Sequence, residues 1–253
     1  MLTKIDFYYF SPTGGTKKAG EMFCDGLSQN VKALDLGKKD VEVEEPKSDL
    51  IVAAAPVFGG RIPAIAAEKL RALNGEGKKA VTLAVYGTRA YEDALLEMNQ
   101  ILEERGFQIV ASAALIARHS IVPEVGEGRP DEKDQEEIRG FARDVLERLE
   151  KDVKGSVKVP GNYPYKDGMS TGVSPVSLEN CNSCGTCEKV CPTGAVHVEN
   201  GKVVNAPEKC ILCMACVYAC PKQARVLPQP LQENMNQKLG VLKSVRRENE
   251  FFL

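Results

Sequence analysis

Eight of the nine cysteines in this chain of 253 residues lie between Cys181 and Cys220. They form two runs of the same pattern, CxxCxxCxxxCP, within the stretches CNSCGTCEKVCPTGA and CILCMACVYACPKQA, which are offset by 29 residues. Cysteines at this density in a reducing compartment indicate metal binding rather than disulfides. Zinc is the simpler alternative, but zinc is usually bound by two separated CxxC pairs. Doubled runs that end in proline favour two iron–sulfur clusters.

The spacing also predicts which cysteines share a cluster. A short loop with a thiolate at every third residue can bind three corners of a cubane, and the fourth cysteine begins the next helix and points to the other cluster. Cluster I is therefore predicted on Cys181, Cys184, Cys187 and Cys220, and cluster II on Cys210, Cys213, Cys216 and Cys191. The segment resembles bacterial two-cluster ferredoxins over its whole length, which implies two [4Fe-4S] clusters and no catalytic residues.

A second candidate site lies near the N-terminus, in SPTGGTKK, residues 11–18, between an apolar run and a helical pattern. The hydroxyls of Ser11, Thr13 and Thr16, with backbone amides around Gly14 and Gly15, suit a phosphate monoester at a helix N-terminus. The glycine spacing of the ATP-binding loop GxxxxGK[ST] is absent. The dinucleotide pattern GxGxxG is absent too, although a ribose-binding acid would sit about 20 residues further on, where Asp35 stands.

The elements around this loop alternate between strand and helix patterns. Strands are expected near residues 3–9, 31–36, 49–57, 79–87 and 107–117, and helices near 16–28, 62–72, 91–106 and 130–152. The third strand, DLIVAAAPV, has no polar alternation, which indicates burial on both faces. Five strands that alternate with helices predict an α/β fold with a parallel sheet covered on both sides.

The pattern [ST]xTGxT after the first strand resembles the phosphate loop of flavodoxins, whose ligand is FMN, and the resemblance covers about residues 1–150. It implies a doubly wound five-stranded parallel sheet of order 2-1-3-4-5. FMN would lie at the carboxyl ends of strands 1 and 3, between the loops after strands 1, 3 and 4. By resemblance, the last two loops hold the flavin ring through Pro56, Val57, Phe58, Gly59, Gly60, Arg61, Tyr86, Gly87, Thr88, Arg89 and Tyr91.

Two features of these loops bear on the flavin. Tyr91 matches the aromatic residue that flavodoxins stack on the ring, and Phe58 lies where many have a tryptophan, which this chain lacks. Arg61 and Arg89 stand where flavodoxins often have acidic residues. Either arginine would raise the flavin potential if it faced the N1 side of the ring; the alternative is that both are solvated. His119, after the fifth strand, is either a ligand contact or a structural hydrogen-bonding residue.

The domain organisation follows from these patterns: an FMN-binding domain over residues 1–152, a linker over 153–175, a small α+β ferredoxin domain over 176–228 and a tail over 229–253. The linker is rich in proline and glycine and is long enough to return to the flavin side of the sheet. We therefore expect one cluster to approach the FMN ring. The tail ends in an apolar FFL, which is expected to pack back on the protein.

The composition limits the partners. With 33 basic and 35 acidic residues and no basic block, the chain is not expected to bind nucleic acid. No apolar run approaches the ~20 residues that span a bilayer, and charged residues lie in the N-terminal stretch, so a cytoplasmic location without membrane contact is expected. The chain resembles flavodoxin–ferredoxin fusions of anaerobic bacteria and archaea.

This resemblance implies an electron-transfer protein that moves electrons between two [4Fe-4S] clusters and FMN and exchanges them with redox protein partners. The alternative is a reductase, in which the clusters supply electrons to FMN and the flavin reduces a small-molecule acceptor. A redox sensor is a third possibility, for which the sequence offers no output domain.

Overall fold

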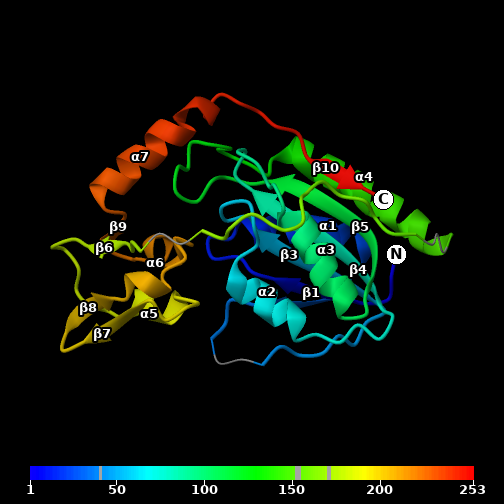
Figure 1. Ribbon diagram of the computed structural model, residues 1–253, viewed down its shortest axis with the longest axis horizontal. Helices are drawn as coiled ribbons and strands as arrows, with labels where there is room; N and C mark the ends of the chain where they lie inside the picture. The colour runs from blue at the N-terminus through cyan, green and yellow to red at the C-terminus, as the bar shows by residue number, and fades with distance from the viewer. Residues whose placement is uncertain (40–41, 152–154, 170–171) are drawn as a thin grey trace.

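The N-terminal half of the computed structural model is built on one six-stranded sheet of order β10-β5-β4-β3-β1-β2 (Figure 1). Residues 1–39, 42–151, 155–169 and 172–253 are described. The parallel strands are β1 (Ile5–Tyr9), β2 (Val31–Asp35), β3 (Leu50–Pro56), β4 (Lys79–Tyr86) and β5 (Gln108–Ile116). The predicted order 2-1-3-4-5 is confirmed. The sixth strand, β10 (Glu250–Phe252), pairs antiparallel with β5 and was not expected.

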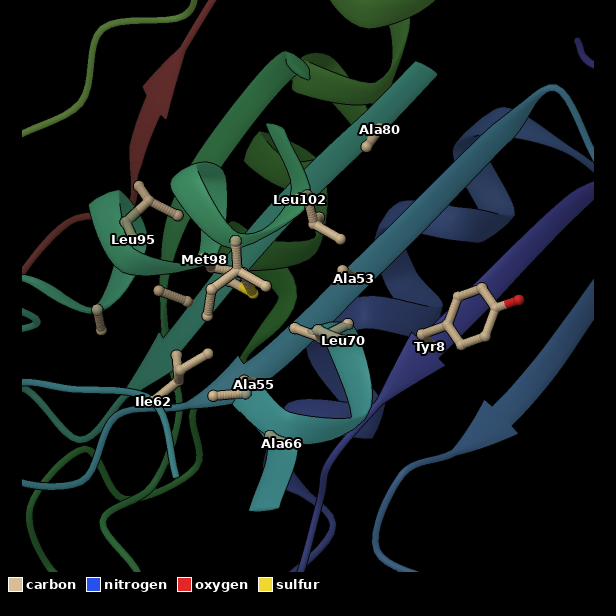
Figure 2. Close-up of a cluster of buried hydrophobic side chains, with 14 of the residues drawn as sticks. Tyr8, Ala53, Ala55, Ile62, Ala66, Leu70, Ala80, Leu95, Met98 and Leu102 are labelled. Atoms are coloured by element: carbon tan, nitrogen blue, oxygen red, sulfur yellow. The ribbon is translucent and has the colours of Figure 1, made fainter. Parts of the chain in front are cut away.

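Two pairs of helices cover the two faces of the sheet. The core on one side packs under α2 (Ala64–Arg71) and α3 (Ala94–Glu104), and Figure 2 shows its side chains. The core on the other side packs under α1 (Gly15–Leu27) and α4 (Glu132–Glu150). Successive residues of β3 alternate between these two cores, which explains why the strand is apolar throughout.

The cysteine region folds into short elements. They are β6 (Val176–Ser177), α5 (Thr186–Val190), β7 (Val196–Glu199), β8 (Lys202–Asn205), η1 (Pro207–Lys209), α6 (Ala215–Tyr218) and β9 (Arg225–Val226). Strands β7 and β8 form a hairpin between the two cysteine runs, and β6 pairs with β9. The tail then forms α7 (Gln229–Leu239), η2 (Gly240–Leu242) and β10.

The segment over residues 155–169 runs back along α3 to the carboxyl ends of the strands. Its Gly161 lies so close to α3 that a Cβ there would come 2.7 Å from Cβ of Leu96. At the start of α3, the carboxylate of Asp93 accepts the backbone N–H groups of Asn162 and Lys166, each at 2.8 Å. These contacts bring the chain to the expected flavin side of the sheet before the cysteine region begins.

The cysteine region and the α/β domain share an apolar contact. Ile121, Val122 and Val125, in the loop after β5, pack against residues of the second cysteine run and of α7, among them Leu212 and Leu239. The tail continues from α7 across to β5, where β10 closes the edge of the sheet (Figure 1). The two modules are thus joined by the linker, by this apolar contact and by the tail.

Candidate cofactor sites

A pocket of about 240 Å³ opens at the carboxyl ends of the parallel strands. This space exceeds the roughly 30 Å³ of one water many times over. Most of the predicted flavin residues line it: Thr13, Gly15, Thr16, Pro56, Val57, Phe58, Gly59, Gly60, Tyr86, Gly87 and Arg89. The strand order reverses between β1 and β3, and the loops that follow them form the pocket, as expected for a doubly wound sheet.

Three of the predicted residues near these loops have other surroundings. Oγ of Ser11 accepts the backbone N–H of Lys17 at 2.9 Å, which satisfies one amide in the first turn of α1. Gly14 has a φ of 90° and lines a neighbouring hollow rather than the main pocket. Thr88 is buried, with a φ of 64°, and is absent from the pocket lining.

Arg61 neither faces the pocket nor is simply solvated, which were the two predicted alternatives. Its guanidinium makes two hydrogen bonds to the carboxylate of Glu97, at 2.7 Å and 2.6 Å, and a third to the carbonyl of Lys166 at 2.7 Å. It is absent from the pocket lining. Arg61 therefore joins the loop after β3 to α3 and to the returning linker, whereas Arg89 does line the pocket and pairs with Glu92 at 2.9 Å.

Tyr91 also differs from the prediction. Its ring is buried in the core, packs edge-on against Tyr86 with 5.3 Å between ring centres, and is not part of the pocket lining. The predicted stacking of Tyr91 on a flavin does not fit this position. Phe58 is the aromatic residue that its loop contributes to the pocket.

Other segments complete the pocket beside the three predicted flavin loops. The loop after β5 contributes residues 117–121, the linker contributes Lys166 and Met169, the second cysteine run contributes Leu212 and Cys213, and α7 contributes Met235 and Leu239. His119 of the loop after β5, the return of the linker and the approach of one cluster agree with the sequence-based expectations. The contribution of α7 was not expected, because its mostly polar sequence indicates no location.

His119 lines the pocket in a fixed orientation. Its Nδ1 accepts the backbone N–H groups of Ile121 and Val122 at 3.1 and 3.2 Å, so the ring proton must be on Nε2. Burial, with a smaller effect of the nearby charge of Arg89, lowers the pKa of His119 to about 4. The ring lies against Gly87, where a Cβ would come 2.6 Å from Cδ2 of His119. At neutral pH the imidazole is an uncharged hydrogen-bond donor.

The neighbouring hollow has the chemistry of a phosphate site. It is lined by Thr13, Gly14, Gly15, Lys18, Arg118, Gly128, Arg129 and Tyr218, with no acidic residue among the described ones. The amides at the start of α1 open into it, and helix N-termini favour anions. The guanidinium of Arg118 lies 5.7 Å from the ring centre of Tyr218, which belongs to α6. Arg129 is paired with Asp134 and Lys18 donates to the carbonyl of Pro130. The guanidinium of Arg118, the hydroxyl of Thr13 and the amides are therefore the groups that fit a phosphate monoester.

Four cysteines surround one cavity in the C-terminal module. These are Cys191, Cys210, Cys213 and Cys216, the set predicted for cluster II. Among the described residues, no three His, Cys, Asp or Glu side chains are arranged to hold a single metal ion. Of the cluster I set, Cys181 and Cys187 are neighbours, Cys184 is exposed and Cys220 is half-buried.

Backbone groups contact the last cysteine of each run in the same way. The N–H of Ala195 points to Sγ of Cys191 at 3.2 Å, and the N–H of Ala224 points to Sγ of Cys220 at the same distance. These are equivalent positions, four residues after the last cysteine of each run. Hydrogen bonds to cluster sulfurs are among the factors that set a cluster's reduction potential.

Comparison with known proteins supports the C-terminal assignment. Residues 176–221 match the family described as the 4Fe-4S dicluster domain. The chain is 41% identical over 69 residues to an uncharacterized polyferredoxin-like protein of Methanocaldococcus jannaschii, covering 27% of this chain and 30% of that protein. It is 37% identical over 73 residues to the electron transport protein HydN of Escherichia coli K12, covering 28% and 42%. The chain thus spans less than half of either relative.

Solved structures resemble the N-terminal half. A flavodoxin of Streptococcus pneumoniae is 18% identical and matches 58% of this chain and 99% of its own, with a TM-score of 0.45. An archaeal flavodoxin is 16% identical and matches 58% and 99%, with a TM-score of 0.42. At these values the strand order, and not the similarity, carries the fold assignment.

The described part of the chain has no helix that is long and apolar enough to cross a bilayer. The strand order of the first half and the family match of the second give the architecture. The chain joins a flavodoxin-like α/β domain to a 4Fe-4S dicluster domain.

Proposed function

We propose that this protein transfers electrons between two [4Fe-4S] clusters and an FMN bound in the α/β domain. One observation carries the proposal: Cys213, a predicted ligand of cluster II, lines the same pocket as Thr16, Phe58 and Gly87 of the predicted flavin loops. A cluster held by Cys213 would therefore lie beside the flavin ring.

The side chains of the pocket have separate tasks in this proposal. Thr13, Arg118 and the first amides of α1 hold the phosphate in the neighbouring hollow, and Phe58 packs on the ring in the main pocket. The Nε2–H of the uncharged His119 ring donates a hydrogen bond to the flavin. Leu212, Met235 and Leu239 exclude water from the side that faces the cluster.

The cofactors match in electron number. Each cluster exchanges one electron, and FMN accepts one or two, so two reduced clusters together supply the electrons for one fully reduced flavin. We place the exchange with redox partner proteins at cluster I. Its Cys184 is exposed, whereas Cys191 and Cys213 of the cluster II set are buried.

The test is an anaerobic analysis of the purified full-length protein. Iron, sulfide and released flavin are quantified, and the visible spectrum is recorded during reduction by dithionite. One FMN and about eight irons per chain, with both chromophores bleached, is the expected result. Iron without flavin would reject the proposal. Rapid reoxidation by a small molecule, but not by ferredoxin-type partners, would favour the reductase alternative.

A further inference from the structure

At one position of the cysteine repeat both halves have a buried residue, but only one of the two is charged. Val196 follows the first run in CPTGAV, and the residue 29 positions later, in CPKQAR, is Arg225. Each begins a short strand, β7 or β9, and their exposed fractions are 3% and 2%. The repeat therefore predicts a second buried aliphatic side chain, and a permanently charged one stands in its place.

The hydrogen bonds of Arg225 leave its charge without a negative partner. Nη1 donates to Oγ of Ser177 at 3.0 Å, and Nη2 donates to the carbonyl of Pro175 at 2.7 Å and to Oδ1 of Asn205 at 2.8 Å. These acceptors are neutral, and no carboxylate within the described part of the chain forms an ion pair with this guanidinium. They fix the orientation of the group without compensating its charge.

Two of the five N–H donors of Arg225 remain, one on Nη1 and one on Nε. Nε is buried and has no hydrogen-bond partner among the described residues. The side chain lines the cavity together with Cys191, Cys210, Cys213 and Cys216. An unpaired buried charge and an unsatisfied buried N–H both cost several kcal/mol. An anionic group in this cavity would satisfy both, and a cubane with four thiolates is such a group.

We propose that Arg225 sets the reduction potential of cluster II, by donating its Nε–H to a cluster sulfur and by placing a fixed positive charge beside the cluster. When cluster II takes up one electron it gains one negative charge, and no proton or bond changes at the guanidinium. The reduced state is therefore stabilised more than the oxidised state. The inference rests on the proposed function only in placing cluster II beside the flavin.

The consequence is a difference between two clusters with the same ligand pattern. The charge of Arg225 also acts on Cys187 of the cluster I set, but its side chain lines the cavity of the cluster II set. The charge should therefore favour an added electron on cluster II more than on cluster I, and cluster II is the one next to the pocket. Arg225 therefore favours electron transfer from cluster I to cluster II.

The test is a redox titration, followed by EPR, of the full-length protein with clusters and flavin bound. Arg225→Gln keeps polar character without charge, and Arg225→Lys keeps charge without the planar fork. Arg143→Gln, on the exposed side of α4, is the control with the same change in net charge. The couple that belongs to cluster II is the one lost in Cys191→Ser.

We expect Arg225→Gln to lower the equilibrium constant for reduction of cluster II about tenfold, which is 59 mV for a one-electron couple. Arg225→Lys and Arg143→Gln should change it about threefold or less. Should Arg225→Gln fail to bind clusters, Arg225→Val, which copies the first half of the repeat, is the second neutral variant. If Arg225→Lys binds both clusters and neither Arg225→Gln nor Arg225→Val does, the result would also show that cluster II needs a positive charge at this position.

A cluster II potential that is unchanged in either neutral variant, with full iron content, would overturn the inference. An equal shift of both clusters would overturn it as well, because it would show a general charge effect. Absence of flavin would instead reject the proposed function. The potentials of the two clusters could still be measured, and they would still test the role of Arg225. The two failures are therefore distinguishable.

Discussion

The hydroxyl of Tyr91 donates a hydrogen bond to the carboxylate of Glu250, with 2.8 Å between the two oxygens. The residue that resembled a flavin-stacking aromatic thus anchors the C-terminal strand. We expect Tyr91→Leu to lower the free energy of unfolding by about 2 kcal/mol, through lost packing and a lost hydrogen bond. The affinity for FMN should change less than about twofold. Urea denaturation and a fluorescence titration with FMN measure the two effects.

The matched variant is Phe58→Leu, which makes the same kind of change in the pocket wall. It should weaken FMN binding about threefold to tenfold, since an aromatic contact contributes about 0.5–1.5 kcal/mol beyond its area. Its stability without flavin should stay near that of the wild type. The opposite pattern, with FMN affinity lost on changing Tyr91, would restore the stacking role.

Arg118 has no carboxylate partner among the described residues and lines the hollow at the start of α1. If it contacts a flavin phosphate, Arg118→Gln should weaken FMN binding roughly 10- to 100-fold, the range for a hydrogen bond to a charged group. Riboflavin, which has the same ring and no phosphate, should bind the variant as it binds the wild type. Fluorescence titration of flavin-depleted protein gives both dissociation constants.

Arg143→Gln is the control for net charge, because that arginine is exposed on α4. An unchanged ratio of FMN to riboflavin affinity in Arg118→Gln would show that the phosphate lies elsewhere.

The crossed ligation predicts that Cys191 acts with the second cysteine run. Cys191→Ser should therefore damage cluster II and leave cluster I and the flavin in place. Iron content should fall towards about four per chain, and the EPR spectrum should lose the interaction between two clusters. Cys184→Ser is the comparison, because it should remove cluster I instead. Loss of the same cluster in both variants would contradict the crossing.

The buried His119 predicts a pH dependence of stability. Its pKa is about 4 in the folded protein and ordinarily 6.5. The unfolded chain therefore binds the extra proton first, and His119 costs no stability above pH 6.5. Stability falls as the pH drops from 6.5 to about 4, by roughly 3 kcal/mol at most. Denaturation of wild type and His119→Gln at pH 7.5 and 5.5 measures this contribution.

The control is His197, the only other histidine, whose side chain is 44% exposed on β7. His197→Gln should retain the wild-type loss of stability at low pH, whereas His119→Gln should reduce it. Equal losses in all three proteins would show that His119 does not remain neutral.

The features that could be predicted from sequence are those that depend on residues close together in the chain. The parallel sheet followed from the alternation of elements, and its strand order from the resemblance to flavodoxins. The cavity that groups Cys191 with Cys210, Cys213 and Cys216 followed from the spacing of one repeat. The roles of Arg61 and Tyr91 could not be predicted, because their partners, Glu97 and Glu250, are 36 and 159 residues away in sequence. Such long-range pairs leave no periodic signal.

The positions of Met235 and Leu239 in the pocket could not be predicted for the same reason. Its helix is mostly polar, and only its packing against the loop after β5 brings it to the pocket. The role of Arg225 could not be predicted for a different reason. The cysteines define the repeat, and Arg225 lies five residues after the last of them.

Strand β10 changes how the chain should be divided. It follows the cluster module in sequence and yet belongs to the sheet of the first domain. The cluster module is therefore an insertion between α4 and β10, and not a C-terminal addition. A domain tethered at both ends has little freedom to swing away from its host. Electron exchange between the two modules should then proceed at a rate that depends on neither protein concentration nor solvent viscosity.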